Sequence, residues 1–318
     1  MYCAPGARSV IRRVISPRAV AGAAISPATA RAAAASQVVL LFRYFPGMGD
    51  YVLPAVMGNV LGGGAHAVGG TDIQEFLVTS FDDDVSRAID ANTAVHRAVG
   101  AALRERFPDT ALGKGDEGAW VAPLENVAAL ELVVEAAQGV ADETGVDIRP
   151  GLDLAASEFY RDGKYVYRDR SLTPAEQVDF VVSLIEDYSL HSVEDPLDQE
   201  DFEAWAALTA RTDALVIGDD LYVTNVTRLA KGIELEATNA VLIKPNQIGT
   251  LTDTITTVAL AREAGLATVI SHRSGETTDT AIAHLGVAFG CHAIKTGVVG
   301  GERIAKLNEL VRIAGELR

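Results

Sequence analysis

Short apolar runs alternate with amphipathic helical stretches from about residue 110 to the end of the 318-residue chain. Residues 173–176 (TPAE) have the form of a capping box with proline at the first helical position, and a single apolar stripe follows over residues 178–185. Alternation at this pitch favours a parallel α/β sheet, and its length favours an eight-stranded barrel over an open sheet. The candidate strands are 214–218, 240–243 and 267–270, with a shorter one at 191–193 and a weaker one at 146–154 that contains Pro150.

Ionisable side chains stand at, or within two residues of, the ends of six candidate strands. Successive members are 41, 25, 25, 28 and 23 residues apart, about the length that a βα unit needs. Parallel strands open their carboxyl ends on one face, so these side chains would meet at the mouth where barrel enzymes hold their active sites. Surface charges are the alternative, but six in phase are hard to explain by packing. The six are Asp153, Glu194, Asp219, Lys244, His272 and Lys295.

The chemistry of this set points to a metal-dependent reaction. Its three carboxylates come from neighbouring strands and provide the oxygen ligands that Mg²⁺ prefers. Lys244 and Lys295 are two of only six lysines, against 21 arginines, which argues against random surface placement. A lysine beside a metal and a second cation can serve as a base, and residues 271–275 (SHRSG) suit a phosphate. The residues alone therefore predict a site for a phosphorylated acid with a lysine as proton abstractor.

Composition excludes several other classes of protein. With 43 acidic residues against 27 Lys and Arg, the formal charge is −16, which excludes a general nucleic-acid binder. Two cysteines, Cys3 and Cys291, cannot form a disulfide framework, so we expect a reducing, cytoplasmic compartment. No apolar run approaches the roughly 20 residues of a membrane helix, so no membrane span is expected.

The first 49 residues differ from the rest because they hold six arginines and no acidic residue. Three interpretations stay open: an organelle-targeting peptide, an alanine-rich helix, or a truncated chain or misplaced gene start. Pro17 and Pro27 are expected to interrupt any continuous helix, which leaves residues 28–36 as a possible one.

Several segments of the acidic body resemble signature segments of the enolase family. The resemblance extends from about residue 53 to residue 318 with order and spacing retained, and it is closest to archaeal members at 118–120 and 298–310. The segments are 114–118 (KGDEG), 152–159 (LDLAASEF), 193–196 (VEDP), 218–221 (GDDL), 242–249 (LIKPNQIG), 271–277 (SHRSGET) and 294–297 (IKTG).

The resemblance implies an α/β fold, an enolase-type TIM barrel of ββαα(βα)6 order. It also implies a phosphopyruvate hydratase, a carbon–oxygen lyase of glycolysis and gluconeogenesis. Such an enzyme dehydrates 2-phospho-D-glycerate to phosphoenolpyruvate, and its partner is this small-molecule substrate. In this reading Asp153, Glu194 and Asp219 are the ligands of Mg²⁺.

The resemblance also implies roles for individual side chains. Lys244 would remove the C2 proton, and Lys295 would hold the substrate carboxylate and keep Lys244 deprotonated. Glu117 would protonate the leaving C3 hydroxyl. Two further catalytic residues, Glu75 and His272, and four further substrate-binding residues, His66, Gln74, Arg273 and Ser274, complete the implied site.

The chain departs from the family at its start. Members carry an N-terminal α+β lobe of well over a hundred residues, and its Ser-Gly-Ala-Ser-Thr-Gly lid loop has no counterpart here. We therefore expect residues 1–50 to be a truncated remnant of that lobe, or irregular, and residues 51–318 to form the barrel. A homodimer or higher homo-oligomer is expected if the lobe is present. The alternative function is a catalytically impaired enolase-like barrel that acts as a binding or scaffold protein.

Overall fold

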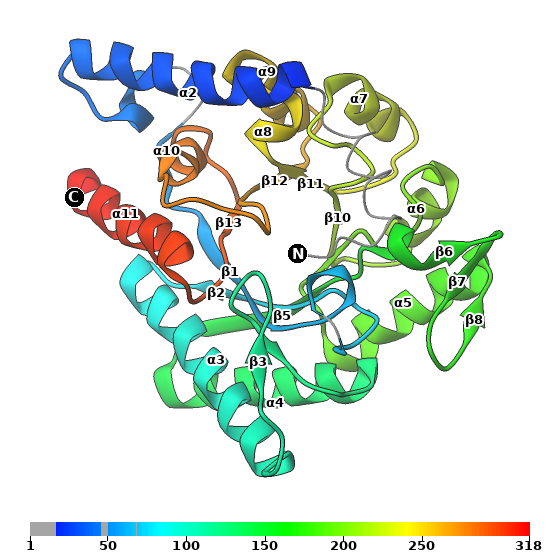
Figure 1. Ribbon diagram of the computed structural model, residues 1–318. Coiled ribbons are helices and arrows are strands. Elements are labelled where there is room, and N and C mark those ends of the chain that lie inside the picture. The colour runs from blue at the N-terminus through cyan, green and yellow to red at the C-terminus, as the bar shows by residue number, and fades with distance from the viewer. Residues whose placement is uncertain (1–16, 46–49, 68) are drawn as a thin grey trace.

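Eight strands close into a barrel, which Figure 1 shows nearly along its axis. The structure is a computed structural model and describes residues 17–45, 50–67 and 69–318. Around the ring the strands pair in the order β1, β2, β5, β9, β10, β11, β12, β13, and β13 pairs with β1 to close it. Their bounds are Ala55–Gly62, Glu75–Phe81, Asp147–Asp153, Ser192–Glu194, Leu215–Gly218, Ala240–Ile243, Ala267–Ser271 and Ala293–Lys295.

Strand direction distinguishes this barrel from one in which all eight strands are parallel. β2 is antiparallel to both of its neighbours, β1 and β5, whereas every other pair around the ring is parallel. Two helices follow the first two strands, and from β5 onward each strand is followed by helix, which gives the ββαα(βα)6 order. The predicted enolase-type α/β barrel is confirmed.

Helices surround the strands on the outside of the barrel (Figure 1). The α5 helix begins as expected, because Thr173 and Glu176 form the complete capping box and Pro174 is its first residue. The helices are α3 (Val85–Arg106), α4 (Asn126–Thr144), α5 (Pro174–Tyr188), α6 (Phe202–Thr209), α7 (Val226–Glu234), α8 (Pro245–Ile248), α9 (Leu251–Glu263), α10 (Ala281–Ala288) and α11 (Gly301–Leu317).

The weakest predicted strand, 146–154, is present as β5 in spite of Pro150. On the side that faces β9, the carbonyl of Pro150 accepts a hydrogen bond from the backbone N–H of His191 at 2.8 Å. The β5–β9 ladder itself begins one residue later, at Gly151. The missing N–H of the proline therefore falls just outside the ladder and costs no strand bond.

Apolar side chains pack in two layers, one on each side of the strands. The larger layer lies between the barrel and its helices and includes Phe76, Val193 and Leu310. A smaller layer fills the barrel, so the barrel is a packed core and not a pore. This inner layer consists of Met57, Leu77, Ile217, Ala240, Leu242, Val269 and Ala293.

The expected interruption of the N-terminal helix is wrong. Helix α2 spans Pro17–Ser36 and runs through Pro27. A proline removes one backbone donor, and contacts with a neighbouring element can hold the helix across that gap. Here the Ser26 hydroxyl accepts a hydrogen bond from the backbone N–H of Leu251 at 3.0 Å, which ties the helix to the start of α9.

The segment before the barrel packs on it. An exposed ion pair joins Arg31 of α2 to Asp279, before α10, and a short 3-10 helix η1 (Leu41–Tyr44) buries Phe42. The described part of this segment, residues 17–45, is thus largely helical. Its division from the barrel at residue 50 stays a prediction.

Small hairpins and surface features complete the fold. β3 (Gly113–Lys114) and β4 (Trp120–Val121) form a hairpin beside β1, and β6 (Tyr160–Arg161), β7 (Lys164–Val166) and β8 (Ser171–Leu172) form a separate small sheet.

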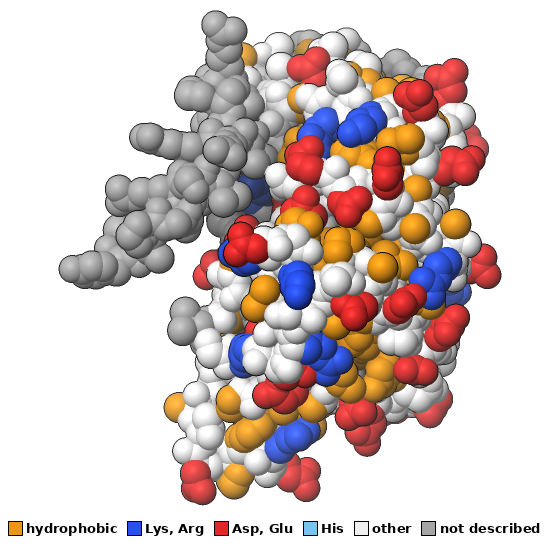
Figure 2. Space-filling view, turned by 90° about the vertical axis from the view of Figure 1, so that its right-hand side faces the viewer, with side chains coloured by type: hydrophobic (Ala, Val, Ile, Leu, Met, Phe, Trp, Pro, Cys, Tyr) orange, Lys and Arg blue, Asp and Glu red, His pale blue; other side chains and the backbone are white. Residues whose placement is uncertain are grey.

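On the face in Figure 2 acidic side chains occur from top to bottom, with basic ones interspersed among them. Within the described residues, every helix is too short or too polar to span a bilayer.

Candidate active site

Three carboxylates lie side by side at the mouth of the barrel because three neighbouring strands bring them into register. Glu75 on β2 pairs with Asp153 on β5, and Asp153 pairs with Glu194 on β9. Glu75 opens its strand whereas the other two close theirs, since β2 runs in the opposite direction. Asp219 directly follows the next strand, β10. All four side chains are buried.

Lys295, at the end of β13, reaches this row of carboxylates. Its Nζ donates to Asp153 Oδ2 at 2.9 Å and to Glu194 Oε2 at 2.7 Å, and it lies 3.2 Å from Glu75 Oε2. Burial lowers the pKa of Lys295, but the surrounding carboxylates outweigh burial and raise this pKa well above its usual value. The side chain is therefore a buried, permanently charged ammonium.

Lys244, which follows β11, forms an ion pair with Asp219. The Asp219 carboxylate also accepts a hydrogen bond from Gln247 Nε2 at 3.0 Å, and Gln247 in turn accepts one from the Thr224 hydroxyl at 2.9 Å. Lys244 is the N-cap of the short helix α8 and Gln247 lies within that helix, which explains how the lysine and the glutamine approach one carboxylate together.

The protonation state of Lys244 differs from the expectation that Lys295 keeps this lysine deprotonated. Burial lowers its pKa and the charge of Lys295 lowers it further, as expected. Asp219 and Glu194 outweigh both effects, however, so the pKa of Lys244 is raised above its usual value. Lys295 alone thus does not keep Lys244 deprotonated, because the carboxylates beside it favour the ammonium form.

The carboxylates have the properties of a cation site. Glu194 Oε1 is buried and has no hydrogen-bond partner, and burial together with Asp153 raises the pKa of Glu194 well above its usual value. Atoms of Asp195, Asp219 and Asp220 lie within 4.8 Å of one another, close enough to hold an ion. Asp153 and Glu194 are instead joined through the Lys295 ammonium. A hard divalent cation suits this excess of carboxylate oxygen.

Glu117 lies in the tight turn 115–118, between β3 and β4. The turn is closed by a hydrogen bond from the Gly118 N–H to the Gly115 carbonyl at 3.0 Å. Gly118 has φ +79°, and a Cβ there would come within 2.7 Å of the Val299 carbonyl oxygen, so only glycine fits. His96 of α3 binds the Gly118 carbonyl through Nε2 at 3.0 Å. A helix on one side and the loop before α11 on the other thus fix this turn.

The Glu117 carboxylate points into the mouth. Its Oε1 lies 3.2 Å from His272 Nε2, and its Oε2 accepts a hydrogen bond from Asn59 Nδ2 at 3.4 Å. Burial raises the pKa of Glu117, but the nearby His272, Lys295 and His66 outweigh burial and hold this pKa well below its usual range. Without a bound anion, the side chain is a carboxylate.

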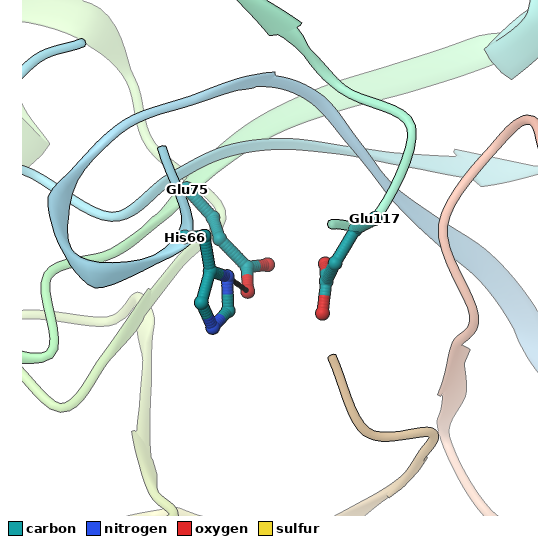
Figure 3. A group of neighbouring side chains, drawn as sticks. All are labelled: His66, Glu75 and Glu117. Atoms are coloured by element: carbon teal, nitrogen blue, oxygen red, sulfur yellow. Dashed lines mark ion pairs between the residues drawn. The ribbon is translucent and has the colours of Figure 1, made fainter. Parts of the chain in front are cut away.

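His66 and Glu75 face Glu117 across a short gap (Figure 3). His66 Nδ1 lies 3.4 Å from Glu75 Oε1, and atoms of these three residues also lie within 4.8 Å of one another. Burial lowers the pKa of His66, but Glu75, Glu117 and Asp153 together raise it above its usual value. The neighbouring Gln74 donates from Nε2 to Asp153 Oδ2 at 3.5 Å.

Residues 272–277 follow β12 and form the last wall of the mouth. His272 is buried, and its backbone N–H donates to the Lys295 carbonyl at 3.0 Å. Arg273 donates from Nη1 to Asn246 Oδ1 at 3.2 Å. A cavity of about 400 Å³ between α2 and the barrel is lined in part by Arg273. Ser274 belongs to the same loop, so all twelve predicted site residues lie at one end of the barrel.

Comparison with known proteins gives this arrangement a family. Residues 50–318 match the family model described as "Enolase, C-terminal TIM barrel domain". The enolase of Methanothermobacter thermautotrophicus is 51% identical over 302 residues, which is 92% of this chain and 73% of that protein. The enolase of Halobacterium salinarum is 50% identical over 305 residues, or 93% of this chain and 76% of that protein.

The chain belongs to the enolase family. The prediction of a phosphopyruvate hydratase, a carbon–oxygen lyase, is confirmed at the level of the family. So is the resemblance to archaeal enolases, since the enolase of Methanocorpusculum labreanum is also 50% identical over 296 residues. The roles of individual residues and of the ion stay predictions.

Sequence reasoning gave no role to several residues of this enolase-family site. Asp195 is the clearest case, because its carboxylate accepts the backbone N–H groups of Asp219 at 2.9 Å and Asp220 at 2.8 Å. Asp195 also has φ +42°, a backbone conformation that costs energy and is common at functional sites. The available signal was a second carboxylate directly after Glu194 at the end of a strand.

Proposed function

We propose that this chain dehydrates 2-phospho-D-glycerate to phosphoenolpyruvate, with Lys244 as base and Glu117 as acid. The observation that carries the proposal is that both groups lie at one mouth of the barrel with different neighbours. Lys244, after β11, forms an ion pair with Asp219, whereas Glu117, in the turn 115–118, lies beside His272 and faces Glu75 of β2. A substrate between them would have a proton acceptor on one side and a donor on the other.

The first step is removal of the C2 proton. Lys244 Nζ, as the free amine, takes this proton, and the electron pair passes into the substrate carboxylate, which becomes an enediolate. Lys295 supplies a fixed positive charge for that carboxylate, since its pKa is raised well above the usual value and it stays protonated. Two lysines of similar chemistry thus have different duties, one as a base and one as a charge.

The second step breaks the bond between C3 and its hydroxyl oxygen. Glu117 donates the proton with which this oxygen leaves as water, and the electron pair of the enediolate forms the double bond of phosphoenolpyruvate. Glu117 is ionised in the resting site, as its lowered pKa indicates. The phosphate and carboxylate charges of an incoming substrate would disfavour that ionised form and return the proton that the step requires.

Asp153, Glu194 and Asp219 would hold Mg²⁺, a role that the buried, unpartnered Glu194 Oε1 supports. The bound ion would offset the charge of these carboxylates, which now favours the ammonium form of Lys244, and would lower the cost of the second charge on the substrate. Arg273 and Ser274 would bind the phosphate, with His272 beside them. Gln74, Glu75 and His66 would contact the substrate near the leaving group.

The test is the formation of phosphoenolpyruvate from 2-phospho-D-glycerate, followed by ultraviolet absorbance as Mg²⁺ is titrated. We expect turnover that requires the ion and is lost on chelation. Lys164→Met, at an exposed lysine on β7, is the matched control for changes at Lys244 and should keep full activity. A folded chain that shows no turnover at saturating Mg²⁺ would reject this function and favour a binding or scaffold protein.

Three coarser expectations accompany the proposal. We infer a small-molecule substrate as the partner, a cytoplasmic location, and a place in glycolysis and gluconeogenesis. Self-association into a homodimer or larger homo-oligomer is a separate prediction, made for a chain in which the N-terminal lobe is present. Sedimentation velocity of a chain that carries this lobe would measure it, and a single monomeric species at micromolar concentration would contradict it.

A further inference from the structure

Arg303 is a buried cation that the proposed mechanism does not use. It lies in the first turn of α11, where its side chain is only 1% exposed. The nearest carboxylate oxygen paired with it, Glu302 Oε1, lies 3.6 Å from its Nε, and that Nε has no hydrogen-bond partner. A charge this deeply buried is costly unless its remaining donors are well used.

The guanidinium holds two parts of the site together. Nη2 donates to the carbonyl of Asp116 at 3.1 Å and to that of Ser274 at 2.7 Å. Nη1 donates to the carbonyl of Arg273 at 2.6 Å. The turn that carries Glu117 and the loop that carries His272 to Ser274 are therefore joined through one planar group with fixed geometry.

The donor and the acceptor in the hydrogen bond between Arg303 and His272 follow from the chemistry of the guanidinium. Arg303 Nη1 lies 2.7 Å from His272 Nδ1. A guanidinium has only donors, so Nδ1 has to accept, and the proton of the neutral ring has to be on Nε2. That Nε2 is buried, has no hydrogen-bond partner and lies 3.2 Å from Glu117 Oε1. Arg303 thus turns a buried N–H donor toward the reacting groups.

We propose that Arg303 is a positioning residue that holds His272 as the Nε2–H tautomer and fixes the Glu117 turn against the loop 271–274. The kinetic part of this inference rests on the proposed function, whereas the tautomer does not. The Nε2–H group of His272 then orients the carboxyl group of Glu117. An anionic substrate would meet this hydrogen-bond donor rather than a lone pair on the ring nitrogen.

The same helix offers a matched control. Lys306, one turn further along α11, is also buried and holds the loop 271–277 through a hydrogen bond from Nζ to the carbonyl of Thr277 at 2.7 Å. Its Nζ also donates to the carbonyl of Glu302, in its own helix, at 3.0 Å. Among the described residues, the hydrogen bonds to His272, Asp116 and Ser274 come from Arg303 and not from Lys306. A loss common to Arg303 and Lys306 variants would therefore reflect loop anchoring alone.

The first experiment is long-range ¹H–¹⁵N correlation of the histidine rings in the full chain at pH 7.5, with His272 assigned from the spectrum of His272→Gln. The wild type should show the Nε2–H pattern for His272. Lys306→Met should keep this pattern, and Arg303→Met should replace it with a mixture of tautomers. An Nδ1–H or doubly protonated His272 in the wild type would overturn the proposal, as would an unchanged pattern in Arg303→Met. The wild-type measurement decides the point even if Arg303→Met fails to fold.

The second experiment measures the two proton transfers separately in the variant Arg303→Lys. This variant keeps the positive charge but loses the planar guanidinium, which donates to several acceptors at once. We expect exchange of the C2 proton to stay within about threefold of wild type while phosphoenolpyruvate formation falls about 10²-fold, with Lys306→Met close to wild type in both. Equal losses of both rates in Arg303→Lys, or an equal loss in Lys306→Met, would reduce Arg303 to a structural anchor. An inactive wild type with the Nε2–H tautomer would reject the proposed function but not the tautomer assignment.

Discussion

Lys244 and Glu117 divide the two proton transfers of the proposed reaction, so their variants should fail in different ways. Lys244→Ala should abolish exchange of the C2 proton with solvent, because no other group stands in the base position. Glu117→Gln should keep that exchange and lower phosphoenolpyruvate formation by about 10²–10⁴-fold, the usual contribution of one acid or base. Solvent deuterium uptake at C2, measured by NMR beside product formation, checks both.

Two outcomes would contradict this division. Exchange that persists in Lys244→Ala would remove that lysine from the base role, and exchange lost in Glu117→Gln would show that the carboxylate acts in the first step. Substrate binding, measured by calorimetry, should stay detectable in both variants, which separates a chemical defect from a misfolded site.

Gln247 is expected to act through Asp219. Its Nε2 donates to Asp219 Oδ1 at 3.0 Å and helps to orient that carboxylate. Gln247→Leu removes this hydrogen bond with little change in volume, and partners of a metal ligand typically contribute 10–100-fold to metal affinity. We therefore expect Mg²⁺ to bind about 10–100-fold more weakly, as measured by calorimetry. Unchanged affinity would mean that Lys244 and the backbone already fix Asp219.

Residues at strand ends could be predicted from sequence, whereas the groups behind them could not. A barrel turns the ends of its strands toward its mouth, and Asp153, Glu194, Asp219 and Lys244 stand at such ends. Their positions in the sequence were therefore informative. Arg303 stands in an ordinary amphipathic helix near the C-terminus. Its importance arises from contacts with residues 116 and 272–274, and no local pattern shows such distant contacts.

The start of α5 offers a direct test of how local sequence fixes an element. Thr173 accepts a hydrogen bond from the Glu176 N–H, and Glu176 accepts one from the Thr173 N–H. Thr173→Ala removes one half of this capping box, and such caps contribute typically about 1 kcal/mol. We expect the free energy of unfolding in urea to fall by about that amount, with no change in the rate of phosphoenolpyruvate formation. A change below about 0.3 kcal/mol would show that tertiary packing alone fixes this helix start.

Prolines mark where element-level prediction succeeded and where it failed. Both Pro27 and Pro150 lie inside regular elements, although local rules place breaks there. At Pro27 the start of α9 binds the helix through Ser26, and at Pro150 no strand bond is lost because the β5–β9 ladder begins at Gly151. The strands with uninterrupted apolar runs, 240–243 and 267–270, needed no such help and were predicted within one residue.

The end of the barrel opposite the site should control acid stability. Burial, Arg149 and His292 lower the pKa of His191 to about 4, so this histidine stays neutral in the folded protein. In the unfolded chain it takes up a proton as the pH falls below about 6.5. Stability is therefore fully present above that pH and is lost as the pH falls toward about 4.

A His191→Gln variant should lose part of this pH dependence. The side chain is half-buried, so we expect the wild type to lose about 1 kcal/mol more than the variant between pH 7 and pH 5. Urea unfolding at the two pH values measures this difference. Equal losses in the two proteins would show that water reaches His191 freely, or that His292 takes up the proton in its place.

The reversal of β2 sets how this barrel can change. Because β1 ends at the mouth and β2 begins there, the connection 63–74 leaves and re-enters the sheet at the same edge, and its described residues include one short 3-10 helix, η2 (Gly64–His66). His66 and Gln74 both lie on it. The end of this connection is tied to the outer layer, because the side chain of Asn126, the first residue of α4, accepts hydrogen bonds from the backbone N–H groups of Asp72 and Ile73. Residues can therefore be added or removed near His66 with less effect on the helices than near Asp72. The reach of the protein over its substrate can thus evolve, or be engineered, separately from the stability of the barrel that supports it.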